Sequence, residues 1–589
     1  MDKLKMHTAS KADENFAKLT QLFPNAVTET ITGYDENGNA IIERAIDKDV
    51  LEQEISTVVV DGSEERYQFT WPDKKKSVIL ANAPIAKTLR PCREESADFD
   101  NTENLYIEGD NLEVMKLLKE TYLGKVKMIY IDPPYNTGSD FIYGDDFGQS
   151  TDEYMENSGQ FDEEGNRLVQ NTEANGRFHT DWLNMIYPRL KLAKNLLTDD
   201  GAIFFSIDFN EFSSAKKIMD EVFGEVNFQR QIIWRIGWLS GYKTAAPNFI
   251  RNHDVILFYS KNHNNLDFKK KYIMNRDFKA LVKKDPAITE KMSSFGLSAE
   301  QQKDLLEFIN HGNRPERYPI EDTWNSNEYD DLNSIAIVSF SGEKISKILD
   351  IDQDFKGQKS IKMLKRLLEA TTEDNEIILD FFSGTASTAH AVMQTNAEDG
   401  GGRKFIMVQL PEETGEKSEA YKAGYKNICE IGKERIRRAG TKIKEENPTM
   451  AQNIDTGFRV LKCDSTNMKD VYYNPAELDP TMFDFFSNNI KEDRTPEDLL
   501  FQVMLDLGVP LSSKIEESTV AGKKVFNIAG GFLIACFDEN VNEETIKAIA
   551  QKKPYYFVMR DSSMANDSVA ANFEQIFAAY SPGTVRKVL

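Results

Sequence analysis

The residues best suited to chemistry lie in one short stretch, residues 128–136, which reads MIYIDPPYN. It opens as an apolar run, typical of a strand buried on both faces, and a double proline then ends the strand. Asp132 is therefore expected at the carboxyl end of a strand, where open α/β sheets bind ligands. Pro133 offers a rigid carbonyl acceptor beside the Asp132 carboxylate. Together the two acceptors can hold one NH2 group, and Tyr135 supplies a flat face for a planar base.

Such a pair of acceptors suits the exocyclic amine of adenine. The nitrogen lone pair of this amine is delocalised into the ring, so it is a poor nucleophile until both hydrogens are held by acceptors. Methyl transfer to it then needs no covalent intermediate. The alternative is an ordinary strand that ends in a Pro-Pro turn; the acid and the apolar strand before the prolines favour a site.

A second candidate stretch lies far downstream, at residues 376–392. An apolar strand runs into a turn of small residues, and a helix with Ser and Thr at its start follows. Small residues let the backbone approach a ligand closely. An ordinary strand-to-helix turn is the alternative, and the presence of the first stretch favours a binding site.

Residues 132–135 resemble the DPPY motif of amino-methyltransferases, enzymes that methylate adenine or cytosine amines with S-adenosylmethionine. The resemblance implies catalytic roles for Asp132, Pro133, Pro134 and Tyr135. It also implies that the second stretch binds the cofactor, through Asp380, Phe381, Phe382, Ser383, Gly384, Thr385 and Ala386.

The cofactor stretch departs from the family pattern at Ala386, where the usual Phe-x-Gly-x-Gly has its second glycine. Alanine tolerates positive φ poorly, so the sequence predicts a negative φ at Ala386. The acid expected after the next strand, at residues 404–408, is also displaced. Gln409 stands in its place and is the favoured contact to the cofactor ribose, with Glu412 as the alternative.

The first motif precedes the second, with a long insertion between them, which resembles the circularly permuted β class of DNA amino-methyltransferases. Within that class the chain resembles the modification subunit of type III restriction-modification systems over roughly residues 90–265 and 355–465. The stretches that carry this likeness are residues 104–112, 135–138, 177–185, 188–190, 200–208 and 252–261.

The resemblance implies three further cofactor contacts, each with a structural alternative. Asp110 would lie near the cofactor's adenine ring, or cap the helix from Leu112 to Leu118, or do both. Lys359 and Ser360 would lie over the methionine end, or belong to a simple cap of the helix that starts at Ile361. Asp208 is expected to support the site without direct contact to the ligand, or to cap the following helix.

The expected fold is α/β: a doubly wound, mostly parallel, Rossmann-like sheet in permuted order, with an inserted target-recognition domain and a C-terminal α+β unit. A chain of 589 residues should hold several domains. We divide it into an N-terminal extension, a DPPY-containing catalytic half, a target-recognition domain, a cofactor-binding half and a C-terminal domain, at residues 1–90, 91–262, 263–355, 356–470 and 471–589. Residues 137–180, acidic and rich in Gly, Asn and Asp, are expected to be a mobile lid or disordered.

The composition and charge of the chain limit the classes of protein to which it can belong. The four cysteines, at 92, 429, 463 and 536, are scattered, so neither a zinc cluster nor a disulfide framework is expected, and a reducing cytoplasm fits. No apolar run is long enough to cross a membrane and the N-terminus shows no export signal. The net charge of -24 disfavours nonspecific binding of nucleic acid. Between residues 261 and 291, however, Lys and Arg outnumber Asp and Glu.

We therefore expect a DNA methyltransferase that acts on the N6 amine of a flipped adenine, without a metal ion. Double-stranded DNA is the expected partner, the protein is expected to form a homodimer, and ATP-driven restriction would need a separate subunit because the chain has no phosphate-binding loop motif. The same chemistry on cytosine, RNA or a protein side chain is one alternative. A catalytically inactive DNA-binding scaffold is another.

Overall fold

The computed structural model describes most of the chain from residue 69 onward and a few short pieces before it. The main described ranges are 69–137, 177–235, 253–277, 285–312, 314–324, 345–350, 359–415, 418–448, 453–469, 489–565 and 567–589. The predicted lid at residues 137–180 lies mostly outside them.

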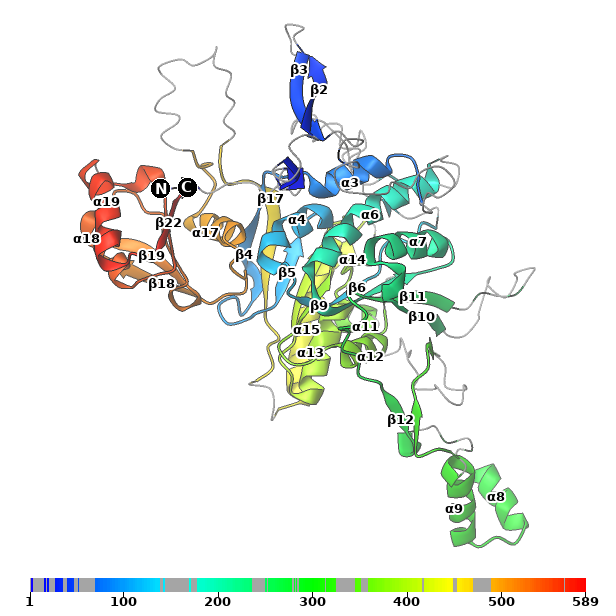
Figure 1. The fold of residues 1–589 in the computed structure, drawn as a ribbon. Helices are drawn as coiled ribbons and strands as arrows, with labels where there is room; N and C mark the ends of the chain where they lie inside the picture. Colours follow the sequence, from blue (N-terminus) through cyan, green and yellow to red (C-terminus); the bar gives the residue numbers. More distant parts are fainter. Residues whose placement is uncertain are drawn as a thin grey trace.

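A ten-stranded sheet forms the centre of the molecule (Figure 1). Strands β9, β6, β15, β16, β5 and β17 are parallel neighbours in that order, and antiparallel strands join both sides of this block. Across the sheet the strands are β14 (Thr323–Trp324), β10 (Phe228–Arg235), β11 (His253–Ser260), β9 (Leu197–Ile207), β6 (Val126–Ile131), β15 (Ile377–Asp380), β16 (Lys404–Gln409), β5 (Leu105–Glu108), β17 (Phe458–Ser465) and β4 (Lys87–Ala97).

Helices cover both faces of this sheet. They are needed on both, because the apolar side chains of the central strand β6 point alternately to one face and the other. Every residue of β6 is buried; Ile129 and Ile131 belong to one apolar core, whereas Met128 and Tyr130 belong to the other. The first core includes α4 (Asn111–Tyr122), α6 (Phe178–Leu196) and α7 (Phe212–Phe223), and the second includes α12 (Ile361–Thr371), α13 (Ser387–Asp399) and α15 (Ile428–Glu446). The predicted doubly wound, mostly parallel fold is confirmed.

Strands β6 and β15 carry the two motifs and lie side by side in the middle of the sheet. The sheet continues from β6 toward β9 on one side and from β15 toward β16 on the other. This is a topological switch point, where the connections diverge and leave a crevice at the carboxyl ends of the strands. The fold therefore brings together two sequence motifs that are more than two hundred residues apart.

The insertion leaves the sheet on a short two-stranded stalk, β12 (Tyr272–Met274) paired with β13 (Arg317–Pro319). Beyond the stalk, α8 (Pro286–Ser294) and α9 (Ala299–Glu307) project away from the body (Figure 1). These elements fall within the predicted target-recognition domain. After residues outside the described part, α11 (Ile345–Leu349) returns and packs on α15.

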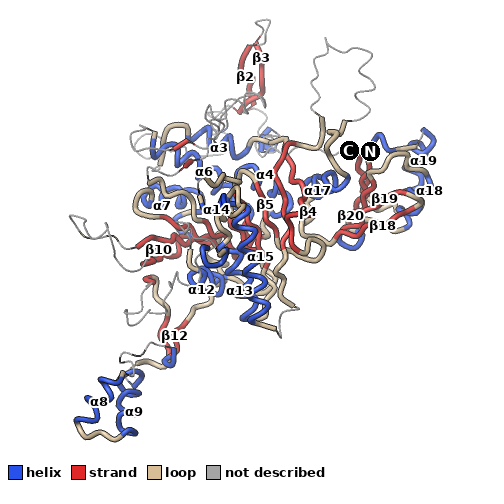
Figure 2. The backbone as a smooth tube through the Cα atoms, turned by 180° about the vertical axis from the view of Figure 1, so that it is seen from behind, coloured by secondary structure: helices blue, strands red, loops and turns tan. Residues whose placement is uncertain are grey.

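The C-terminal unit has its own six-stranded sheet, in the order β1-β22-β21-β20-β19-β18, flanked by α18 (Glu543–Gln551) and α19 (Asp567–Tyr580). Its strands are β18 (Ile515–Val520), β19 (Lys523–Ile528), β20 (Leu533–Cys536), β21 (Tyr556–Met559), β22 (Val585–Val588) and β1 (Asp2–Lys3). The predicted α+β unit is thus present, and β1 brings the two chain termini together, as Figure 2 shows from behind. Strand β1 of the predicted N-terminal extension thus joins the C-terminal sheet. Strand β4 spans residue 90, the predicted end of that extension.

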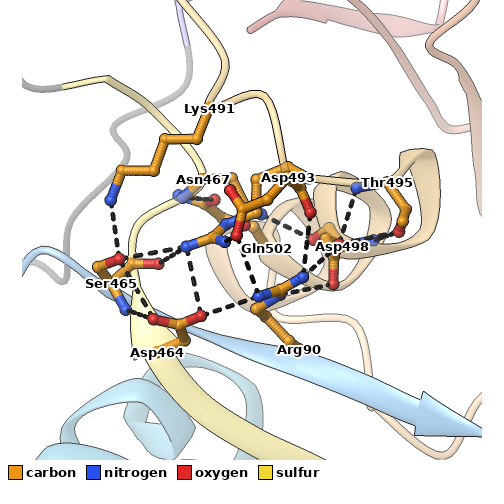
Figure 3. A network of polar contacts seen from close by, with 10 residues as sticks. Arg90, Asp464, Ser465, Asn467, Lys491, Asp493, Thr495, Asp498 and Gln502 are labelled. Atoms are coloured by element: carbon orange, nitrogen blue, oxygen red, sulfur yellow. Dashed lines mark hydrogen bonds and ion pairs between the residues drawn. The ribbon is translucent and has the colours of Figure 1, made fainter.

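A polar network fastens the C-terminal part to the edge of the large sheet (Figure 3). Asp498 lies in α17 (Pro496–Asp506); its carboxylate accepts hydrogen bonds from the Arg90 guanidinium of β4 at 3.1 Å and from the Thr495 backbone at 2.8 Å. The Thr495 hydroxyl in turn accepts from the Asp498 backbone at 3.2 Å, so the two residues form a capping box. One carboxylate therefore caps a helix and joins two units.

Replacing Asp498 with alanine is expected to destabilise the protein by about 3 kcal/mol, because a largely buried charge pair and a helix cap are lost together. Asp493 is the matched control: it contacts the same Arg90 at 3.6 Å, but its side chain is 65% exposed. Asp493→Ala should cost less than about 1 kcal/mol. Urea denaturation of both variants measures the difference, and equal losses would contradict the role given to Asp498.

Candidate active site

The predicted acceptor pair lies where β6 ends, at the crevice between β6 and β15. The Trp182 indole in α6 donates to the Pro134 carbonyl at 2.7 Å and fixes the loop. In the part of the chain that the structure describes, no hydrogen bond reaches the Pro133 carbonyl. One Asp132 carboxylate oxygen is buried and makes no hydrogen bond of good geometry. The Pro133 carbonyl is therefore available to a substrate, whereas this Asp132 oxygen has the Lys359 ammonium 3.0 Å away.

Tyr135 follows the acceptor pair and is held by its hydroxyl. That hydroxyl accepts a hydrogen bond from the Lys359 ammonium at 2.7 Å and lies 2.9 Å from the Ser206 hydroxyl of β9. Asn136 has a positive φ of 59° and donates to the Glu211 carboxylate at 2.6 Å. The loop conformation is therefore set by contacts to β9 and to the start of α7.

Lys359 lies in the amine site, although the sequence placed it among the cofactor contacts. Its ammonium is 3.0 Å from the Asp132 carboxylate and 4.9 Å from the centre of the Tyr135 ring. The ring of Trp234 is also near, at 5.6 Å. Burial raises the pKa of Asp132, and the adjacent Lys359 opposes this rise. Ser360, the next residue, is buried and is the N-cap position of α12.

The cofactor turn begins at Asp380, whose carboxylate organises the residues after it. It accepts hydrogen bonds from the Phe382 backbone at 3.1 Å and from the Thr388 hydroxyl at 2.6 Å. Burial nevertheless raises the pKa of Asp380 to about 7. Phe381 and Phe382 are buried, with ring centres 5.3 Å apart. Asp380 thus shapes the turn from inside.

The predicted negative φ at Ala386 is wrong. Ala386 has φ 59° and ψ 40°, the left-handed conformation that glycine occupies without strain. Its backbone N–H donates to the Ser383 carbonyl at 2.8 Å, and its side chain is fully buried. The buried Arg435 of α15 donates to the hydroxyls of Thr385 at 3.1 Å and Ser387 at 2.8 Å. Contacts on both sides therefore hold alanine in a conformation it disfavours.

Replacing Ala386 with glycine is expected to leave the free energy of unfolding nearly unchanged, because relief of about 1 kcal/mol of backbone strain offsets the lost methyl group and the extra chain entropy of glycine. Ala391, equally buried within the same helix, is the matched control. Ala391→Gly should lower stability by about 1–2 kcal/mol. Urea denaturation compares them, and an equal loss in both variants would contradict the strain.

Gln409, the predicted ribose contact, supports the turn with both ends of its amide. Its carbonyl oxygen accepts from the Gly384 backbone at 2.7 Å, and its amide nitrogen donates to the Leu410 carbonyl at 3.1 Å. The side chain of Glu412, the alternative, is partly exposed one short step away. In this conformation Gln409 shapes the cofactor turn.

Asp110 does cap α4: its carboxylate accepts from the Leu112 backbone at 2.8 Å. The fully buried Arg189 of α6 donates to Asp110 at 3.1 Å and to the Asn111 side chain at 2.5 Å. Asn111 then donates to the Phe381 carbonyl at 2.7 Å. The sequence reasoning gave no role to Asn111 or Arg189, although both lie in stretches that carry the family resemblance.

The crevice suits S-adenosylmethionine on three observations. Gly384 has φ 50°, and a Cβ built there would meet nothing within 4 Å, so the turn has open space beside it. Asp110 follows strand β5, which lies two places along the sheet from β15, so it is at the same edge of the sheet. The buried Phe381 and Phe382 rings lie near the start of the turn, where aromatic faces suit a sulfonium cation.

Asp208, at the end of β9, lies 3.6 Å from the Arg251 guanidinium and accepts a hydrogen bond from the Asn210 backbone at 2.8 Å.

The residues that the structure describes include neither a metal-binding cluster nor a membrane-spanning helix. Among them, no group of three or more His, Cys, Asp or Glu side chains is arranged to hold a metal ion. None of their helices has both the length and the apolar character needed to span a membrane.

Comparisons with known proteins identify the family of this chain. Residues 126–437 match the family model of DNA methylases. The chain is 30% identical to the Mod subunit of the type III restriction-modification enzyme EcoP15I from Escherichia coli, over 92% of this chain and 91% of that protein. It is 32% identical to the StyLTI Mod subunit of Salmonella typhimurium strain LT2, over 76% of this chain and 74% of the other. The EcoPI Mod subunit of Escherichia phage P1 is 29% identical, over 88% of both chains.

A doubly wound sheet with an acceptor pair and a small-residue turn at its switch point defines an amino-methyltransferase, and the matched family is one of DNA methylases. The chain is accordingly an S-adenosylmethionine-dependent DNA methyltransferase. It belongs, more narrowly, to the Mod subunits of type III restriction-modification enzymes.

Proposed function

We propose that this chain methylates the N6 amine of an adenine flipped out of duplex DNA, at the site formed by Asp132, Pro133, Pro134 and Tyr135. The observation that carries the proposal is the acceptor pair at the end of β6, beside an aromatic ring and opposite the cofactor turn, with the Lys359 ammonium 3.0 Å from its Asp132 oxygen. An adenine amine has two hydrogens for these two acceptors. Its base has a flat face for Tyr135.

The chain's own residues would act by orientation and electrostatics. Asp132 and the Pro133 carbonyl hold the two amine hydrogens and aim the nitrogen lone pair toward the cofactor turn. The Asp132 carboxylate would stabilise the positive charge that develops on the nitrogen as it takes the methyl group from sulfur, and would accept the proton that the nitrogen then loses or pass it to water. S-adenosylmethionine, when bound, supplies an electrophilic methyl group on a sulfonium.

An adenine inside a duplex cannot reach the acceptor pair, so base flipping belongs to the proposal. Flipping costs about a few kcal/mol, and stacking on Tyr135, worth about 1–3 kcal/mol, offsets part of that cost. The Lys359 ammonium now lies where the amine would bind, 3.0 Å from Asp132, so it must shift when a base enters.

The cofactor-binding role of the turn is part of the same proposal. Asp110 and the turn residues from Asp380 to Ala386 hold the cofactor. Gln409 positions Gly384 in that turn. Ser360 is the N-cap position of α12, and Glu412, a partly exposed residue shortly after β16, is the proposed contact to the ribose.

The remaining parts suggest how the enzyme meets its partners. We assign DNA sequence recognition to the insertion between residues 263 and 355, because its helical pair α8 and α9 projects from the body on a stalk. A homodimer and an ATP-driven restriction subunit are expected partners. The C-terminal unit, fastened to the body by the Asp498 network, is the proposed docking part for one of them.

The test is transfer of a labelled methyl group from S-adenosylmethionine to unmethylated genomic DNA, followed by digestion to nucleosides. Label in N6-methyladenine is the expected result. Label in methylated cytosine would overturn the adenine assignment while keeping the chemistry. Cofactor binding without label in any nucleoside would overturn DNA as the substrate of the isolated chain, and the loss of both would leave an inactive scaffold.

A further inference from the structure

A second cavity, of about 490 Å³, lies outside the methyl-transfer site. Its walls come from β9, β10 and β11 of the sheet, from α12, and from the residues where the insertion leaves and rejoins the body. None of the residues that line it belongs to either motif. The volume is in the range of small-molecule binding sites.

Arg366 of α12 is the most unusual residue of this cavity. Only 9% of it is exposed, and its Nη1 makes no hydrogen bond within the described part of the chain. Its guanidinium lies over the Trp324 ring, 4.9 Å from the ring centre. Glu369 is the carboxylate that acts on it, but Glu369 is itself paired with Lys271 at 3.3 Å. Burial accordingly lowers the pKa of Arg366 to about 10.

A buried cation without a carboxylate of its own is unfavourable, and an anionic ligand would remove the penalty. Three further cations, Arg230, Lys270 and Lys271, line the same cavity, and Lys271 is the one paired with Glu369. Arg230 is exposed, so it can meet a ligand without losing an internal contact. Guanidinium groups bind phosphate through paired hydrogen bonds, which makes a phosphate the best match for Arg366 and Arg230.

Another part of the wall is aromatic and suits a flat ring. Phe204 and Phe258 are stacked, with ring centres 4.6 Å apart, and Phe268 continues this wall 5.8 Å from Phe258. Phe268 is 49% exposed, so one of its faces is open. Aromatic side chains of this kind stack on nucleobases. Glu321 and Asp322, also in the lining, are acceptors suited to hydroxyl or amino groups.

We propose that this cavity binds a nucleoside phosphate, with the phosphate on Arg366 and Arg230 and the base on the Phe258–Phe268 wall. The ligand would sit where the insertion is tied to the body: the Lys269 backbone donates to the Ala370 carbonyl at 2.8 Å, and the Ile233 backbone donates to the Asp322 carbonyl at 2.8 Å. A bound nucleotide would therefore link α12 to both ends of the insertion. It can arrive free in solution or as one unit of a DNA strand.

The test uses the full-length protein with its cofactor crevice saturated by S-adenosylhomocysteine, and AMP as the probe in isothermal titration calorimetry. AMP should bind at one site, and both Arg366→Met and Arg230→Ala should weaken binding at least tenfold. Arg366→Met keeps the side-chain volume, and Arg230→Ala alters only an exposed residue, so folding is preserved in at least one of them. Lys552→Ala, at an exposed position on the C-terminal unit, is the charge-matched control and should bind AMP normally.

A second arm distinguishes the two sources of the nucleotide. A 5′-phosphorylated single-stranded oligonucleotide is titrated by fluorescence anisotropy against the same variants. AMP binding that the two cavity variants weaken supports a free nucleotide. If AMP does not bind, but the oligonucleotide loses at least tenfold in affinity in both variants and not in Lys552→Ala, the nucleotide belongs to a DNA strand. The proposal is overturned if neither probe responds to Arg366 and Arg230.

Discussion

Replacement of Asp132 by asparagine is expected to lower methyl transfer at saturating cofactor by about 10²–10³-fold, the usual effect of removing one preorganised electrostatic group. Asparagine keeps the shape of the side chain and one acceptor oxygen, but it removes the negative charge that faces the reacting nitrogen. Binding of S-adenosylmethionine should change little, since Asp132 belongs to the amine site. Single-turnover transfer of labelled methyl groups to a DNA substrate measures the rate.

Asp199→Asn is the matched control for this variant. Asp199 belongs to the neighbouring strand β9, is exposed, and lies near the start of that strand, away from the crevice. It should retain the parent rate. An Asp132→Asn enzyme that keeps more than about one tenth of the parent rate would show that the carboxylate is not the group that stabilises the developing charge.

The two motifs could be predicted from the sequence because each is a local pattern. An apolar strand stopped by Pro133 and Pro134 places an acid at a strand end whatever the rest of the chain does. The switch point then follows from general rules for doubly wound sheets, and β6 indeed lies beside β15. Helix α12 begins at Ile361 as predicted.

The conformation of Ala386 could not be predicted because tertiary contacts override the local preference. Propensity alone gives alanine a negative φ, yet Arg435 holds the residues on both sides of it. Arg435 is some fifty positions further along the chain. Nothing in the turn itself announces that partner.

The link between the motifs is also invisible in the sequence. Arg189 donates to Asn111, and Asn111 donates to the carbonyl of Phe381, so α6, the start of α4 and the cofactor turn share one hydrogen-bonded path. A fully buried arginine signals such a path only once its burial is known, because arginine is usually exposed. The sequence therefore predicts the two motifs, whereas the buried residues that hold them in place can be recognised only from the fold.

The position of Lys359 is the difference between prediction and structure that matters most for the mechanism. The sequence assigns it to the cofactor, but its ammonium contacts Asp132 and the Tyr135 hydroxyl. Burial raises the pKa of Asp132, and this cation is the group that opposes the rise. We infer that Lys359 positions the acceptor pair: it opposes the rise that burial causes in the pKa of Asp132, and it holds Tyr135 until a base enters.

Lys359→Met should therefore change the pH dependence of methyl transfer as well as its rate. Without the cation the pKa of Asp132 rises further above its ordinary value, so the carboxylate is protonated over a wider range on the acid side. The acid limb of the rate profile should move to higher pH by about 1 unit or more, the usual effect of one adjacent charge. The rate near neutral pH should fall by about tenfold, and Lys359→Arg should restore much of the profile.

Lys362→Met is the control, because Lys362 lies on the same helix and is exposed. Its profile should match the parent. A merely structural role for Lys359 predicts a lower rate with an unmoved acid limb, because misplacing the loop lowers activity equally at every pH. A displaced limb in Lys359→Met that the arginine variant reverses would instead tie the lysine to the ionisation of Asp132, and hence to the step in which the amine becomes a nucleophile.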